Sequence, residues 1–128
     1  MRKICVDLDG VLARYGGWNG KEEPIGDPLP GAVEFVDELS QIAKVVIHTC
    51  RCNEIGKTEE IGRLRDRVME WLDKHGFKYS EIFIGRGKPI ASAYVDDKAV
   101  ACDPQNIPDA FDNAMQECRR LCDLERNT

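Results

Sequence analysis

A chain of 128 residues is long enough for one domain with a buried core, and its 42% hydrophobic and 32% charged residues are typical of a globular rather than a disordered protein. A net charge of −5 gives no general electrostatic attraction to the nucleic-acid backbone. No apolar run is long enough to cross a membrane, and Asp7 interrupts the first one where a signal peptide would continue, so we expect a cytoplasmic protein.

The first predicted element is a buried strand over residues 3–8, which reaches two carboxylates, Asp7 and Asp9, at its end. Burying an unpaired carboxylate costs several kcal/mol, so this pair must meet solvent, a cation or both. Gly10 follows directly, and a glycine at this position lets backbone amides approach an anion closely.

A long segment over residues 14–31, rich in glycine, proline and charge, is predicted to form a flap that takes part in substrate binding. Its polar and aromatic residues could lie above the site: Arg14, Tyr15, Trp18, Asn19 and Lys21. Trp18 is either a lid or stacking platform, or else a packing or dimer contact.

The rest of the chain alternates between predicted helices and predicted strands. Helical spacing of apolar residues predicts helices over 32–43, from 58 to 74 or 75, and over about 107–124. Short apolar runs predict strands over 44–48, 81–85, 91–95 and 99–102. Apolar strands that alternate with helices indicate an α/β fold. We therefore predict a single domain over residues 1–128, a three-layer Rossmann-like sandwich with a mainly parallel five-stranded sheet.

Polar side chains stand where several of these strands end. In parallel α/β sheets, ligands bind beyond the carboxyl ends of the strands. An oxygen-only cluster of carboxylates without histidine or cysteine partners favours Mg²⁺, and Mg²⁺ together with an ammonium group suits phosphoryl transfer. The residues that would form this site are Asp7, Asp9, Thr49, Lys88, Asp96 and Asp97.

Four segments, VDLDGVLA, VVIHTCR, GKP and YVDD, resemble in their order the four motifs of the haloacid-dehalogenase (HAD) superfamily of phosphotransferases. The resemblance extends from residue 3 to about residue 103 and implies a HAD-like fold. It implies that Asp7 is the nucleophile that takes the phosphoryl group and that Asp9 is the general acid and base. Thr49 would hydrogen-bond the phosphoryl oxygens, and Lys88, with Lys98 as the alternative, would steady the transferring group.

The same resemblance implies a Mg²⁺ ion held by Asp7, by the backbone carbonyl of Asp9, and by Asp96 and Asp97. Either Asp96 or Asp97 would be the direct ligand, and the other would act through water. The residues expected to bind substrate are Gly10, Thr49, Arg51, Lys88 and Trp18, although Arg51 could equally be solvated.

These observations predict a Mg²⁺-dependent phosphohydrolase that cleaves phosphate monoesters through an aspartyl-phosphate on Asp7. Residues 14–31 offer only a loop at the first position where the family carries a cap, so we expect a capless member. Its substrate would be a small phosphorylated metabolite or an exposed phosphate on a larger molecule. The alternatives are a phospho-receiver signalling domain, whose acidic pair would precede the phosphorylated aspartate in the chain, and an inactive phosphate-binding scaffold.

Overall fold

The computed structural model describes residues 2–17, 20, 22–52, 58–85 and 87–126. The chain divides into two compact units, residues 1–97 and 98–128. The first unit holds the sheet with helices α1 (Ala32–Ile42) and α2 (Thr58–Lys74), and the second holds helix α3 (Ala110–Arg126). Within the described ranges, none of these helices combines the length and the apolar character needed to cross a membrane.

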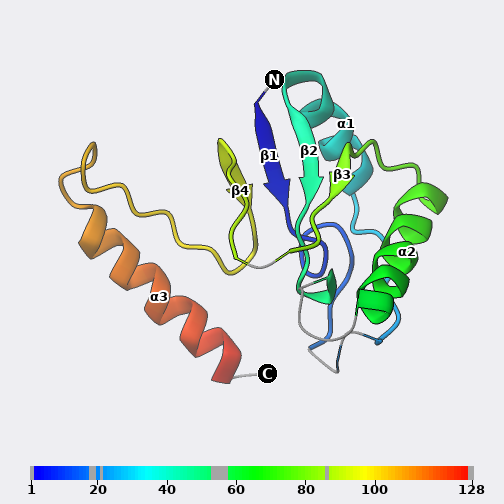
Figure 1. The fold of residues 1–128 in the computed structure, drawn as a ribbon. Coiled ribbons are helices and arrows are strands. Elements are labelled where there is room, and N and C mark those ends of the chain that lie inside the picture. Colours follow the sequence, from blue (N-terminus) through cyan, green and yellow to red (C-terminus); the bar gives the residue numbers. More distant parts are fainter. Residues whose placement is uncertain (1, 18–19, 21, 53–57, 86, 127–128) are drawn as a thin grey trace. The chain divides into compact units, whose positions relative to one another are not determined.

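In the part of the chain that the structure describes, the sheet consists of four parallel strands in the order β3-β2-β1-β4, which lie side by side in Figure 1. Their bounds are β1 (Lys3–Val6), β2 (Lys44–Ile47), β3 (Glu81–Ile82) and β4 (Ala93–Val95). Strand β1 is central and pairs with both β2 and β4. The predicted α/β class with a parallel sheet is therefore confirmed.

Helices α1 and α2 cover the same face of the sheet. The chain steps from β1 through α1 to β2, and through α2 to β3, in one direction across the sheet, and right-handed crossovers in one direction place both helices on one side. The packing agrees, because side chains from one face of β1 and β2 share a buried cluster with side chains of both helices: Val6, Val45, Ile47, Val36, Val68 and Leu72.

The prediction of a fifth strand over residues 99–102 is wrong, because these residues form no strand and the described part of the chain has four strands in its sheet. Three of the four side chains, Ala99, Ala101 and Cys102, are exposed. A short apolar run becomes a strand only where a neighbouring strand supplies hydrogen bonds, and periodicity does not reveal that neighbour. The third layer and the single domain over residues 1–128 stay predictions.

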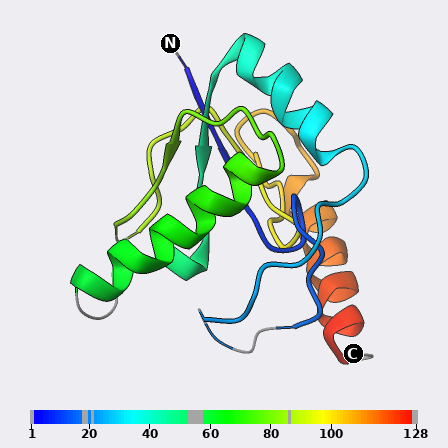
Figure 2. The same ribbon diagram turned by 90° about the vertical axis from the view of Figure 1, so that its right-hand side faces the viewer.

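The loop between β1 and α1 lies beyond the carboxyl ends of the strands, as the blue-to-cyan trace in Figure 2 shows. Its two ends pair with each other, because the Arg14 N–H donates to the Asp27 carbonyl at 2.8 Å and the Leu29 N–H donates to the Leu12 carbonyl at 2.9 Å. Of the residues predicted to lie above the site, Trp18, Asn19 and Lys21 fall outside the described residues.

Helix α2 anchors the same loop. The indole N–H of Trp71 donates to the Gly26 carbonyl at 3.1 Å. The carboxylate of Glu22 forms ion pairs with Arg63 and Arg67, each at 2.8 Å. The loop is thus fixed at its base and again along α2, at the edge of the sheet where the predicted site residues stand.

Candidate active site

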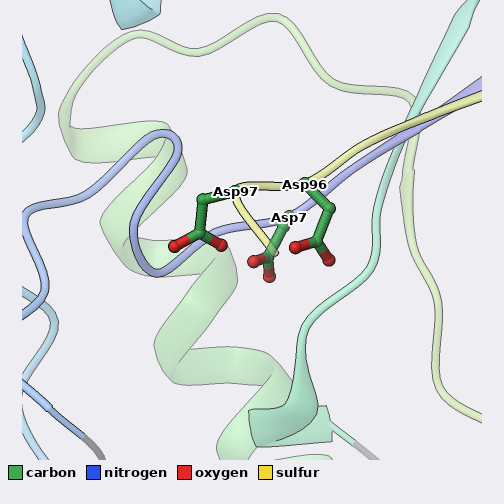
Figure 3. Close-up of side chains that lie close together, drawn as sticks. All are labelled: Asp7, Asp96 and Asp97. Atoms are coloured by element: carbon green, nitrogen blue, oxygen red, sulfur yellow. The ribbon is translucent and has the colours of Figure 1, made fainter. Parts of the chain in front are cut away.

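Three carboxylates meet at the carboxyl edge of the sheet. Strands β1 and β4 pair in register up to Val6 and Val95, and the Asp7 N–H donates to the Val95 carbonyl at 2.9 Å. The residues that follow in the two strands, Asp7 and Asp96, are therefore neighbours, and Asp97 comes next. One carboxylate oxygen from each of the three lies within 4.8 Å of the others, and Figure 3 shows the side chains pointing to the same side.

This crowding changes the acidity of Asp7. Burial, the charges of Asp96 and Asp97, and the charge of Asp9 raise the pKa of Asp7 to about 7, against an opposing hydrogen bond from the Leu8 N–H. That hydrogen bond reaches Oδ1 of Asp7 at 2.9 Å. Carboxylates gathered this closely repel one another, and a divalent cation with oxygen ligands is the group that removes the repulsion. The donor set thus fits Mg²⁺.

Gly10 is required at this edge for two reasons. Its backbone φ is 90°, a value that residues with a Cβ rarely adopt. A Cβ built on Gly10 would also stand only 2.5 Å from Oδ2 of Asp97. Its N–H donates to the Ala13 carbonyl at 2.8 Å. Glycine at this position therefore makes room for the Asp97 carboxylate.

The raised pKa of Asp7 predicts how the stability of the metal-free protein depends on pH. The folded state holds the Asp7 proton up to about pH 7, whereas the unfolded chain releases it near its ordinary value of 3.8, so the free energy of unfolding falls as pH rises between these values. We expect Asp7→Asn to remove this decrease in the free energy of unfolding. In urea unfolding with a chelator, the variant should be more stable than wild type at pH 8 by about 2 kcal/mol, a figure reduced for partial exposure. The difference should shrink towards pH 4, and a constant difference across the range would contradict the assignment.

Thr49 stands at the end of the neighbouring strand, just after β2, and is only 2% exposed. Its Oγ1 accepts a hydrogen bond from the Arg51 backbone N–H at 3.2 Å, and its carbonyl accepts one from the Cys52 N–H at 3.1 Å. The side-chain oxygen is thus fixed as an acceptor, so the hydroxyl hydrogen can be donated elsewhere. This placement suits the predicted hydrogen bond to a phosphoryl oxygen.

Asp9 is paired with Arg51. Nε of Arg51 donates to one carboxylate oxygen of Asp9 at 2.8 Å, and Nη2 donates to the other at 3.0 Å. Arg51 is 5% exposed, and its Nη1 also donates to the Glu23 carbonyl in the loop. The Asp9 carboxylate is therefore not part of the group formed by Asp7, Asp96 and Asp97. The predicted metal contact through the Asp9 carbonyl stays a prediction.

The sequence did not indicate this pairing. Of the two alternatives for Arg51, the solvated position is wrong, because the structure places this residue in the interior between Asp9 and the loop. Its role in phosphate binding stays a prediction. The available signal was its position two residues after Thr49, at the end of a buried strand. A buried arginine there needs an acidic partner, and two aspartates, Asp7 and Asp9, follow the neighbouring strand β1.

Lys88 contacts an aromatic ring of strand β4. Its ammonium group stands 4.1 Å from the centre of the Tyr94 ring, and its side chain forms no ion pair with any residue that the structure describes. The structure therefore does not bring Lys88 into an ion pair with the carboxylates, and its role in phosphoryl transfer stays a prediction. The alternative lysine, Lys98, belongs to the second unit.

No protein-family model matches the chain, and no curated protein matches it. Among solved structures, a target protein from Vibrio cholerae is 26% identical, with a TM-score of 0.48, over 94% of this chain and 98% of that chain. A D,D-heptose 1,7-bisphosphate phosphatase from B. bronchiseptica, solved with magnesium and phosphate, is 24% identical, with a TM-score of 0.43. That match covers 91% of this chain and 63% of the phosphatase chain.

Proposed function

We propose that this protein is a Mg²⁺-dependent phosphohydrolase of the haloacid-dehalogenase type, which cleaves phosphate monoesters. The observation that carries the proposal is the meeting of Asp7 with Asp96 and Asp97 at the carboxyl edge of the sheet. The buried hydroxyl of Thr49 stands at the end of the adjacent strand. The proposed site thus combines a nucleophile, a set of metal ligands and a hydrogen-bond donor for a phosphoryl oxygen at one edge of the sheet.

The proposed metal ligands are Asp7, the backbone carbonyl of Asp9, and Asp96 or Asp97. Mg²⁺ prefers such oxygen ligands and keeps several waters, so exposed carboxylates suit it. When bound, the ion would offset the negative charge of the carboxylates and of the phosphoryl group. The capless form and the five-residue substrate set of Gly10, Thr49, Arg51, Lys88 and Trp18 belong to the same proposal.

Asp7 would act as the nucleophile. Its Oδ1 is held by the Leu8 N–H, which leaves Oδ2 to attack phosphorus and form an aspartyl-phosphate as the bond to the leaving oxygen breaks. Asp9 would give a proton to that leaving oxygen, and would then take one from the water that attacks the intermediate. Thr49 would donate to a phosphoryl oxygen throughout, and Lys88 would steady the transferring group.

The proposed substrate is a phosphorylated metabolite or an exposed phosphate on a larger molecule, reached in the cytoplasm. The loop over residues 14–31 supports this proposal, since it stands over the carboxyl edge and forms no helix or strand in its described residues. A loop anchored along α2 can shape the entrance to a site without enclosing it.

The proposal predicts hydrolysis that depends on the metal. Protein stripped with a chelator should not hydrolyse 4-nitrophenyl phosphate, and added Mg²⁺ should restore turnover, because the clustered carboxylates need the ion before a phosphate can approach. The measurement is the rate of nitrophenol release against Mg²⁺ concentration. Equal rates with and without metal would contradict the proposal, and a phosphoprotein lasting hours without turnover would favour a receiver domain.

A further inference from the structure

A cavity of about 200 Å³ lies beside Asp9, and its lining in the described part of the chain does not include the three clustered carboxylates. Its wall carries two guanidinium groups and a phenol, together with the glycines of the loop. The lining side chains used below are Asp9, Arg14, Tyr15, Glu23 and Arg51. Because Asp9 is proposed to protonate the leaving oxygen, this cavity stands where the leaving group of a substrate would lie.

Arg51 forms the buried part of the wall. Three of its nitrogen atoms donate to oxygens of Asp9 and Glu23, and the Glu23 oxygen is a backbone carbonyl. The side chain is thus held in one orientation, with its planar fork turned to a carboxylate. A guanidinium offers only donors, and its fork matches carboxylate and phosphate oxygens equally well.

Arg14 forms the exposed part of the positive charge at this cavity. Its backbone is fixed, because its N–H donates to Asp27 and Gly26 packs directly against its carbonyl. Its guanidinium is exposed and makes no hydrogen bond or ion pair with a residue in the described ranges. The exposed guanidinium of Arg14 on its fixed backbone, together with the held guanidinium of Arg51, is a suitable clamp for a small anion.

We propose that this cavity binds a second anionic group of the substrate, so that the substrate is a phosphomonoester whose alcohol portion carries a carboxylate or a second phosphate. The inference rests on the proposed function. The oxyanion would lie between Arg14 and Arg51 and would compete with Asp9 for the fork of Arg51. Asp9 would then turn to the leaving oxygen. Substrates with a neutral alcohol portion would leave Asp9 paired with Arg51.

The volume of the cavity limits the size of the anionic group that it can hold. Pockets for drug-sized ligands span roughly 300–1,000 Å³, so about 200 Å³ suits a small oxyanion on a short carbon chain better than a nucleoside. The hydroxyl of Tyr15 and the backbone of the loop glycines complete the lining.

A matched three-carbon series tests the proposal with Mg²⁺ present. The substrates are glycerol 1-phosphate, 3-phosphoglycerate and propanediol 1,3-bisphosphate. We expect kcat/KM of the wild type to be about tenfold higher for the two esters with an anionic tail, 3-phosphoglycerate and the bisphosphate, which is the value of one charge-assisted hydrogen bond. Arg14→Gln should reduce this ratio towards one, mainly through KM, and Arg51→Lys should reduce it through kcat as well. Arg65→Gln, an exposed arginine on α2, should leave the ratio unchanged.

Binding separates this inference from the proposed function. By calorimetry with Mg²⁺, 3-phosphonopropionate and 4-phosphonobutyrate should bind the wild type about tenfold more tightly than propylphosphonate does, and Arg14→Gln should abolish the difference. Turnover of all three esters with no preference, together with equal binding, would overturn the second-anion site and leave the phosphatase intact. Preferential binding without turnover of any ester would support the site and overturn the phosphatase.

Discussion

Replacing Asp7 by asparagine is expected to abolish phosphate-ester hydrolysis, with kcat lower by about 10³-fold or more. A carboxamide cannot form the acyl phosphate, and Asp7 is the carboxylate whose neighbours include both Asp96 and Asp97. Its backbone N–H pairs with Val95 and its Oδ1 accepts from Leu8, so the asparagine side chain can keep the same position. The variant should therefore fold, and its loss of activity should report the chemistry.

The measurement is single-turnover and steady-state hydrolysis of an aryl phosphate with saturating Mg²⁺. Asp66→Asn is the matched control, because Asp66 is an exposed aspartate on α2 that pairs with Arg65. It makes the same chemical change outside the site and should keep wild-type turnover. Activity of the Asp7→Asn variant near the wild-type level would exclude Asp7 as the nucleophile.

Replacing Arg51 by methionine is expected to lower the free energy of unfolding by about 3–5 kcal/mol, which is the usual cost of removing one partner from a buried ion pair. Both side chains are enclosed: that of Arg51 is 6% exposed and that of Asp9 is 12% exposed. Without the guanidinium, the buried Asp9 carboxylate loses two hydrogen-bond donors. The Glu23 carbonyl loses its donor as well, so the loop loses one of its attachments.

Urea unfolding measures this effect, and Arg67→Met is the matched control. Arg67 also pairs with a glutamate of the loop, Glu22, but both of these side chains are about half exposed. Its loss should cost about 1 kcal/mol or less. The double variant Arg51→Met/Asp9→Leu should recover part of the stability, because no unpaired charge then remains. Similar small losses for Arg51→Met and Arg67→Met would contradict the buried pairing.

Helices with strong apolar periodicity could be predicted from the residues alone. Helix α2 ends at Lys74, one of the two predicted ends, and Gly76 lies just beyond it with a φ of 79°, a conformation that glycine adopts without strain. The sequence also placed Asp7 and Asp96 at strand ends. In a parallel sheet the carboxyl ends of the strands share one edge, so residue order alone indicated that these carboxylates would converge.

Features that depend on a partner distant in the chain could not be predicted from local sequence. The run over residues 99–102 looked like a strand, but a strand needs a neighbour, and local sequence does not encode one. The register of Val6 with Val95 set which aspartate lies beside Asp7. Arg51 and Asp9 are 42 positions apart, and only the packing of the loop against the ends of β1 and β2 brings them together. Local patterns record which face of an element is apolar, whereas the pairing of buried charges depends on how complete elements pack, and that is fixed only when the chain is folded.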